Sequence, residues 1–264
     1  MSTKEKIEVP VMSELFAKGQ KPEYLYWIGC AGAFDLRYSK VAKAFAMILN
    51  YLKTDYAVLG TEETCTGDPA RRAGNEMLFQ MQAMTIIEIF KSYEVKKIIC
   101  ICPHCYNIFK NEYPDLGGNY EVIHYTEFLA DEIKKGKIKL NKSKVPSKSA
   151  TFHDPCYLGR ANDIYDAPRY IIEQLGIKHI EMKRNKSFAL CCGAGGSQMF
   201  KDAEKGDKEI FIERTEEALE TNTEAIISSC PFCMTMMTDG LKYKNKEEEI
   251  ENLDIAEIIL KALE

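Results

Sequence analysis

Two stretches of this sequence share one pattern: Lys97-Ile-Ile-Cys-Ile-Cys102-Pro-His-Cys105 and Ala225-Ile-Ile-Ser-Ser-Cys230-Pro-Phe-Cys233. Each is a short apolar run that leads into Cys-Pro-x-Cys. An apolar run of this length predicts a buried strand. The proline that follows it is typical of a helix start, where its missing N–H costs nothing. Both cysteine pairs are therefore expected at the junction between a strand and a helix.

The two stretches belong to a longer repeat. The second cysteine pair follows the first at an offset of 128 residues, from 102 to 230. Two further landmarks recur at an offset of 126: Cys65-Thr66-Gly67 matches Cys191-Cys192-Gly193, and Cys30-Ala-Gly matches Cys156-Tyr-Leu-Gly. Three cysteine landmarks at a nearly constant offset indicate an internal duplication.

The duplication predicts two lobes joined by a linker. We expect the first cysteine-rich lobe at 23–133 and the second at 150–264. Residues 134–149 carry seven lysines and no acidic residue, and they also contain Pro146 and Gly136. Like charges repel and resist burial, so this segment is expected to be a solvated linker. A docking patch for an acidic partner is the alternative.

Within each half, short apolar runs alternate with helical spacing of apolar residues. We expect strands at 24–28, 56–60, 97–101, 150–153, 187–190 and 225–228, and helices at 38–52, 74–93, 165–175 and 207–220, with further helices beginning at Pro103 and Pro231. Alternating strands and helices predict parallel sheets, so the fold class is α/β with two pseudo-symmetric Rossmann-like lobes. Ligands of such folds collect at the carboxyl ends of strands, which is where each cysteine group lies.

Composition narrows the function. The 264 residues carry a net charge of −5, which gives no case for nucleic-acid binding. No apolar run approaches the ~18 residues of a membrane helix, and the first eight residues lack the apolar core of a secretion signal. We therefore expect a cytoplasmic protein without a membrane span of its own. In a reducing compartment, the ten cysteines point to metal binding or redox catalysis rather than to structural disulfides.

The cysteines fall into one set per lobe. The first set, Cys30, Cys65, Cys102 and Cys105, offers the four thiolates that a [4Fe–4S] cube or a zinc ion needs. The second set has five members, one more than either group takes: Cys156, Cys191, Cys192, Cys230 and Cys233. Its vicinal pair can serve two different iron atoms. Cys100 has no counterpart in the repeat and is interpreted as a buried small side chain, and the four histidines are interpreted as structural or surface residues.

The second half resembles the cysteine-rich CCG motif of the B and D subunits of heterodisulfide reductase and related iron–sulfur subunits. The resemblance is carried by His153-Asp-Pro-Cys156-Tyr-Leu-Gly-Arg160, Cys191-Cys-Gly-Ala-Gly-Gly196 and Cys230-Pro-Phe-Cys233, and Trp27-Ile-Gly-Cys30 resembles the same family in the first half. It implies two CCG lobes, with a non-cubane [4Fe–4S] cluster on the five-cysteine set. In that family such clusters cleave a disulfide in one-electron steps, which would place the reaction at the ligands Cys191 and Cys192. The first lobe departs from the pattern at Thr66, so a [4Fe–4S] cubane or zinc is expected there, with an impaired site as the alternative.

The sequence therefore predicts an iron–sulfur redox subunit that passes electrons onward or reduces a disulfide. It contains neither a Gly-x-Gly-x-x-Gly dinucleotide motif nor a ferredoxin cysteine run, so electrons are expected from a ferredoxin-type, flavoprotein or quinone-linked partner chain. Two other interpretations stay open. A zinc-binding assembly module fits four cysteines but leaves the fifth unexplained, and a metal-free thiol-disulfide oxidoreductase would keep its activity after chelation.

Overall fold

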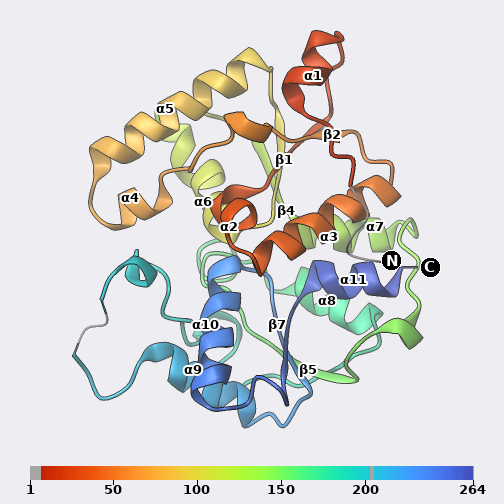
Figure 1. The fold of residues 1–264 in the computed structure, drawn as a ribbon, viewed down its shortest axis with the longest axis vertical. Helices are drawn as coiled ribbons and strands as arrows, with labels where there is room; N and C mark the ends of the chain where they lie inside the picture. The colour runs from red at the N-terminus through yellow and green to blue at the C-terminus, as the bar shows by residue number, and fades with distance from the viewer. Residues whose placement is uncertain (1–6, 203–204, 264) are drawn as a thin grey trace.

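The computed structural model describes residues 7–202 and 205–263, which fold into two lobes that lie one above the other in Figure 1. Each lobe is built on a four-stranded parallel sheet, with strand order β2-β1-β3-β4 in the first lobe and β6-β5-β7-β8 in the second. The strands are β1 (Tyr24–Trp27), β2 (Tyr56–Ala57), β3 (Lys97–Cys100), β4 (Glu121–His124), β5 (Ser149–Phe152), β6 (Lys178–His179), β7 (Ala225–Ser228) and β8 (Glu251–Asp254). The two orders are the same when β5 is matched to β1, and the predicted α/β class with duplicated lobes is confirmed.

The helices connect these strands and cover the sheets. Those of the first lobe are α1 (Met12–Ala17), α2 (Gly29–Phe34), α3 (Tyr38–Tyr51), α4 (Asp68–Arg72), α5 (Glu76–Ser92), α6 (Pro103–Asn107) and α7 (Tyr125–Lys134). Those of the second lobe are α8 (Asp166–Gln174), α9 (Ile210–Leu219), α10 (Pro231–Tyr243) and α11 (Ile255–Ala262). Short 3-10 turns lie at Gly60–Glu62, Tyr113–Leu116, Lys142–Lys144, Lys186–Phe188 and Gln198–Phe200, and a π-helical turn lies at Ile108–Glu112.

Most of the predicted elements agree with the structure to within a few residues, and one is wrong. The strand expected at 187–190 is an irregular segment that begins with the 3-10 turn Lys186–Phe188. The edge strand of this lobe is instead β6, which pairs with β5. The apolar residue that suggested a strand does not face a core, because the side chain of Phe188 is 82% exposed.

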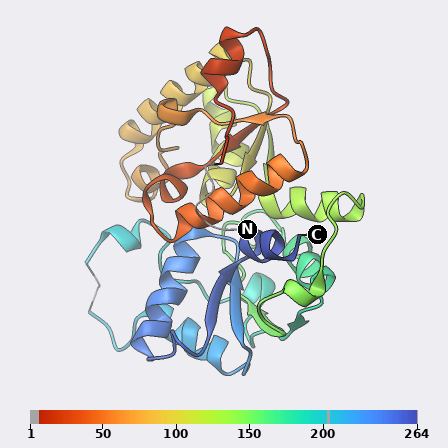
Figure 2. The same cartoon turned by 45° about the vertical axis from the view of Figure 1, so that its right-hand side comes forward.

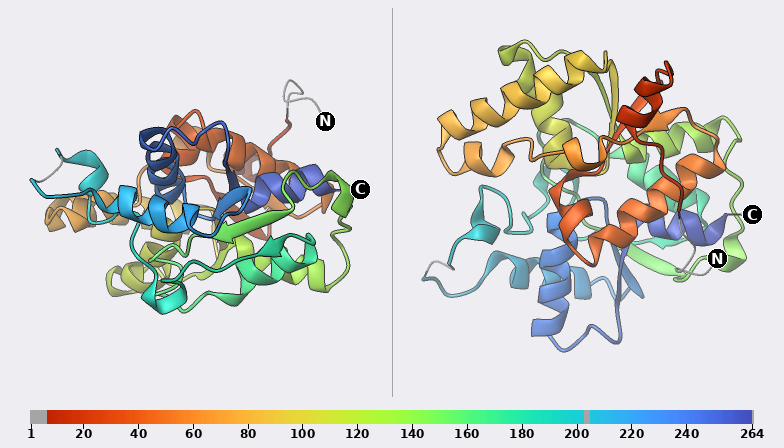
Figure 3. Two further views of the ribbon diagram at one scale, coloured as in Figure 1. Left: turned by 90° about the horizontal axis from the view of Figure 1, so that it is seen from below. Right: turned by 45° about the horizontal axis from the view of Figure 1, so that its top comes forward.

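The two lobes pack together through reciprocal helix contacts. Helix α3 of the first lobe lies against α11 of the second, and α7 lies against α8 (Figures 2 and 3). One continuous apolar core runs across this contact and contains Phe45 and Leu129 from the first lobe together with Ile171 and Ile259 from the second. The lobes are therefore held in a fixed relation.

Polar contacts reinforce the same interface. The Tyr125 hydroxyl donates to Asp254 Oδ1 at 2.8 Å, and Arg37 pairs with Glu257 at 2.6 Å. Burial raises the pKa of Asp254 to about 8, although the Ala256 N–H and Tyr125 both donate to its carboxyl group. A buried acid thus caps α11 at the contact between the lobes.

The segment expected as a linker leads from α7 into β5. All seven of its lysines are exposed, whereas Ile138 is buried and Leu140 forms a bridge with Leu263. Its apolar residues therefore anchor it to the body of the protein. Residues 1–6, on which the expected compartment partly rests, lie outside the described part of the chain. Within that part, no helix has both the length and the apolar character needed to cross a bilayer.

Candidate metal centre

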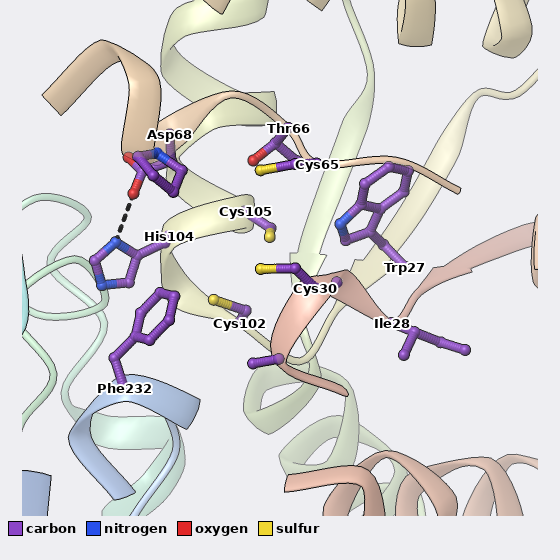
Figure 4. Close-up of a pocket in the computed structure, with 13 residues that line it drawn as sticks. Trp27, Ile28, Cys30, Cys65, Thr66, Asp68, Cys102, His104, Cys105 and Phe232 are labelled. Atoms are coloured by element: carbon purple, nitrogen blue, oxygen red, sulfur yellow. Dashed lines mark hydrogen bonds and ion pairs between the residues drawn. The ribbon is translucent and has the colours of Figure 1, made fainter. Parts of the chain in front are cut away.

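The four first-lobe cysteines come from three segments, each of which follows a strand. Cys30 lies in α2 directly after β1, and Cys65 lies in the loop that leads from β2 to α4. Cys102 precedes α6 and Cys105 lies within it, after β3. All four side chains line one pocket (Figure 4). Parallel strands end at the same edge of a sheet, and this edge brings the predicted set together.

Contacts between the sulfur atoms of this set change their acidity. A hydrogen bond between Cys30 and Cys65 lowers the pKa of Cys65 to about 7 and raises that of Cys30. A hydrogen bond with Cys102, together with burial, raises the pKa of Cys105. The N–H of Gly67, whose φ of 89° is left-handed, lies 3.5 Å from Cys65 Sγ. The turn thus brings a backbone donor against a sulfur atom.

The five second-lobe cysteines form a chain of contacts. Cys156 follows β5, the pair Cys191-Cys192 lies in the long loop before α9, and Cys230 and Cys233 lie at the start of α10 after β7. The Sγ atoms of Cys192 and Cys233 are 3.5 Å apart. Cys191 accepts hydrogen bonds from Cys156 and Cys192, which lower its pKa. All ten cysteines of the chain are free thiols.

The two sulfur sets are neighbours across the lobe contact. The x residue of each Cys-Pro-x-Cys loop reaches the other lobe. Phe232 lines the first-lobe pocket (Figure 4), and His104 hydrogen-bonds to Cys230. The two rings meet edge to face with centroids 4.8 Å apart. His104 Nδ1 lies 2.9 Å from the Asp68 carboxylate. Burial works against a charge on His104, but Asp68 and Cys230 raise its pKa to about 10.

A comparison with known protein families matches both lobes. The family model described as "Cysteine-rich domain" (CCG) matches residues 24–110 and again residues 150–238. The two matches span both cysteine sets and more than half of the chain. This chain belongs to the CCG cysteine-rich domain family. The two CCG matches also agree with the duplication that the sheets display.

Three curated proteins show which larger proteins contain such lobes. The chain is 43% identical to the probable iron-sulfur-binding oxidoreductase FadF of Bacillus subtilis, with 97% of the chain and 36% of that protein covered. It is 46% identical to EtfAB:quinone oxidoreductase of Syntrophomonas wolfei, covering 93% and 35%. It is 36% identical to the D subunit of the heterodisulfide reductase of Methanosarcina barkeri, covering 92% and 59%. The chain therefore spans about a third of the length of the first two relatives.

The spacing of the sulfur atoms bears on which group the CCG lobes fit. Among the described residues, one set of three metal-binding side chains has all donor atoms within 4.8 Å of one another, namely His153, Cys192 and Cys233. The four first-lobe sulfurs form no such compact set. Thiolates around one zinc ion lie about 3.8 Å apart, as a tetrahedron with Zn–S bonds of about 2.3 Å requires. A zinc ion therefore requires a more compact set of sulfur atoms than the four first-lobe cysteines form.

Thr66 occupies the position of the missing vicinal cysteine. The turn Cys65-Thr66-Gly67 matches Cys191-Cys192-Gly193 in detail: each glycine N–H approaches the first cysteine, at 3.5 and 3.3 Å, and the glycine φ angles are 89° and 93°. Thr66 is buried, as is Cys192. The turn thus has the same glycine geometry in both lobes, and the difference between a four-thiolate and a five-thiolate set lies in the side chain at this one position.

Sequence reasoning missed three polar rings at the two sets. The sequence pattern indicates structural or surface roles for His104 and His153, and it places Trp27 only in a strand. The structure places Trp27 in the lining of the first-lobe pocket and His153 beside the second set. Burial and the charge of Arg214 lower the pKa of His153 to about 3. The repeat itself held the signal, because Trp27 and His153 occupy equivalent positions three residues before the first cysteine of each set. Cys100 is buried and lies outside both sets, as predicted.

Proposed function

We propose that this chain is the iron–sulfur module of an oxidoreductase complex that resembles heterodisulfide reductase. The observation that carries the proposal is the gathering of nine cysteines into two neighbouring sets at equivalent edges of two CCG lobes. Its relatives have names that describe iron–sulfur binding, quinone reduction and heterodisulfide reduction, which supports a redox role. Iron–sulfur clusters supply one-electron transfer, which is the chemistry that such complexes share.

We assign the ligands by lobe. Cys30, Cys65, Cys102 and Cys105 would hold a cubane [4Fe–4S] cluster, because four thiolates match its four irons. The second lobe would hold a non-cubane [4Fe–4S] cluster on its five thiolates, namely Cys156, Cys191, Cys192, Cys230 and Cys233. The pair Cys191-Cys192 would then form the reaction site, with a disulfide as the candidate substrate.

The arrangement of the lobes suits electron transfer between the two sets. His104 and Phe232 contact each other where the two sets approach, and each belongs to the cysteine loop of one lobe while contacting the other. Electrons would enter from a ferredoxin-type, flavoprotein or quinone-linked subunit. The module would work in a reducing, cytoplasmic compartment, where cysteines stay available as cluster ligands.

A zinc-stabilised assembly module is the second candidate, and the compact set of His153, Cys192 and Cys233 favours it. The surroundings of His153 oppose it. Arg214 Nε donates to His153 Nδ1 at 3.0 Å, so the ring proton must lie on the other nitrogen, Nε2. A nitrogen that carries a proton has no lone pair to offer to a metal. The same atom can instead donate a hydrogen bond to sulfur.

Elemental analysis of the anaerobically purified chain distinguishes the candidates. Two [4Fe–4S] clusters predict a brown protein with about eight iron and about eight acid-labile sulfide per chain, whose colour bleaches on reduction. Zinc with little iron would support the assembly module instead. A purified chain that contains neither iron nor zinc and keeps disulfide reductase activity after chelation would support a metal-free thiol enzyme.

Paired variants test the assignment by lobe. Cys105→Ser and Cys233→Ser change equivalent positions of the two sets, so each should lose about four iron atoms per chain and leave the other lobe loaded. A variant that loses all of its iron while remaining folded by circular dichroism would contradict independent centres.

A further inference from the structure

Each lobe buries an aromatic ring N–H at its cysteine set. The rings belong to Trp27 at the end of β1 and His153 directly after β5, both 1% exposed. His153 Nε2 lacks a hydrogen-bond partner among the described residues, and a buried N–H without a partner costs about 1–3 kcal/mol. The Trp27 indole N–H faces the Cys105 sulfur, where it favours the thiolate. At two positions related by the duplication, the sulfur-rich site is thus the acceptor available to a buried ring N–H.

The protonation of His153 follows from its contact with Arg214. A guanidinium group only donates hydrogen bonds and stays charged, so the Arg214 Nε donor at 3.0 Å requires a lone pair on His153 Nδ1. The neutral ring then carries its proton on Nε2. A ring nitrogen of His153 lies within 4.8 Å of the sulfur atoms of Cys192 and Cys233. With Nδ1 engaged by Arg214, Nε2–H is the ring donor that remains available.

The Arg214 side chain is itself held in place. It is 0% exposed, and its Nη1 donates to Glu217 at 2.9 Å and to the Arg184 carbonyl oxygen at 2.8 Å. Glu217 in turn accepts from the Arg184 side chain at 3.0 Å. This buried pair fixes the guanidinium group, and with it the tautomer of His153.

In the first lobe, Trp27 occupies the equivalent position and offers an indole N–H in place of the imidazole N–H of His153. Its indole is fixed by edge-to-face contacts with Phe90 and Phe109. The indole nitrogen faces the sulfur atoms in Figure 4, and a Cβ added at Gly29 would lie 3.5 Å from Cys105 Sγ and 3.8 Å from Trp27 Nε1. An indole N–H donates only and has a single tautomer, so no counterpart of Arg214 is needed here.

We propose that Trp27 and His153 are equivalent positioning residues that donate N–H···S hydrogen bonds to the first-lobe and second-lobe iron–sulfur centres. The inference rests on the proposed function. A donor near sulfur stabilises the more negative, reduced state of a cluster, so each ring raises the reduction potential of the centre in its own lobe. His153 acts as a donor to the centre and not as one of its ligands.

The test uses Trp27→Phe and His153→Leu in the full chain, each serving as the control for the other. The iron and sulfide contents are measured first. A wild-type chain without iron would contradict the proposed function itself, whereas a loaded chain allows this inference to be tested separately. In loaded protein, potentiometric titration followed by electron paramagnetic resonance (EPR) should show Trp27→Phe lowering the potential of the first-lobe centre only. His153→Leu should lower that of the second-lobe centre only. We expect at least a tenfold change in the ratio of reduced to oxidised centre, equivalent to about 59 mV. His153→Gln keeps an N–H and should restore part of the potential.

A measurement on the wild-type chain covers the case in which a variant fails to load. Electron–nuclear double resonance of the reduced protein, labelled with ¹⁵N-histidine, should show a solvent-exchangeable proton at the second-lobe centre and only weak nitrogen coupling. A strong nitrogen coupling would make His153 a ligand and overturn the proposal. Loaded variants whose potentials match that of the wild type would overturn it as well.

Discussion

Exchanging the side chains at positions 66 and 192 should exchange the character of the two centres. The turns around Thr66 and Cys192 have matching glycine φ angles and glycine N–H to sulfur distances, so the backbone already accommodates either residue. Thr66→Cys adds a fifth thiolate to the first lobe. Cys192→Thr removes the fifth thiolate from the second lobe and serves as the reciprocal variant.

The cost to stability should be moderate. Thr66 is 2% exposed and Cys192 is 4% exposed, and the two side chains have similar volumes. The hydrogen bond from Tyr113 goes to the backbone carbonyl oxygen of residue 66 and does not depend on the side chain. The exchange does alter a buried hydroxyl group, which costs about 1–3 kcal/mol. For a chain of this size, the melting temperature of the metal-free protein should fall by less than about 12 °C.

EPR spectra of anaerobically prepared protein provide the assay. The intensity of the five-thiolate EPR signal is measured per chain and set to one for the wild type. On this scale, Thr66→Cys should give about two and Cys192→Thr about zero. Iron content serves as the control and should stay near the wild-type value in Thr66→Cys. A loaded Thr66→Cys protein with an unchanged spectrum would refute the reasoning that this side chain decides the type of centre.

Three further outcomes follow from single positions. In Gly240→Ala, the added Cβ would lie 2.8 Å from the Cβ of Thr215, so α9 and α10 must separate; chemical denaturation should show a loss of about 1–3 kcal/mol, and an unchanged unfolding midpoint would contradict this contact. The pKa of Asp254 is raised by burial from 3.8 to about 8, so the folded state keeps a proton that the unfolded chain releases. The resulting stability is present below about pH 4 and is lost as the pH rises toward 8, by up to about 1.4 kcal/mol per pH unit. Asp254→Asn should flatten this slope in urea titrations at several pH values, and a slope equal to that of the wild type would count against the assigned pKa. Cys100→Ala should keep the full iron content, unlike Cys105→Ser, because Cys100 lies outside both sets; loss of iron would mean that the first-lobe set is wrong.

The parts of the fold that sequence predicted are those with strong local patterns. The apolar runs before the two Cys-Pro-x-Cys loops are fully or almost fully buried as β3 and β7, so their composition identified them. The repeat offsets then predicted which cysteines would meet. Strands β4 and β8 were missed because each lies at a sheet edge with a mixed, partly exposed pattern, as in Glu-Asn-Leu-Asp of β8. The false strand at 187–190 shows the opposite error, because Phe188, the largest side chain of this apolar run, is exposed.

The missed parts of the site depend on contacts between distant residues. Nothing local to His104 indicates that it will reach Cys230 of the other lobe, because that contact exists only after α3 and α7 have packed against the second lobe. The role of His153 likewise depends on Arg214, which lies 61 residues away in the chain. The repeat could have paired Trp27 with His153, but an aromatic residue at a strand end is usually core packing, and both rings are indeed buried.

Anomalous diffraction from crystals grown and kept without oxygen tests the central claim most directly. Difference maps recorded above and below the iron edge should show two sites per chain, one among Cys30, Cys65, Cys102 and Cys105 and one among Cys156, Cys191, Cys192, Cys230 and Cys233. A single site, a signal at the zinc edge alone, or iron bound away from these sulfur atoms would contradict the account.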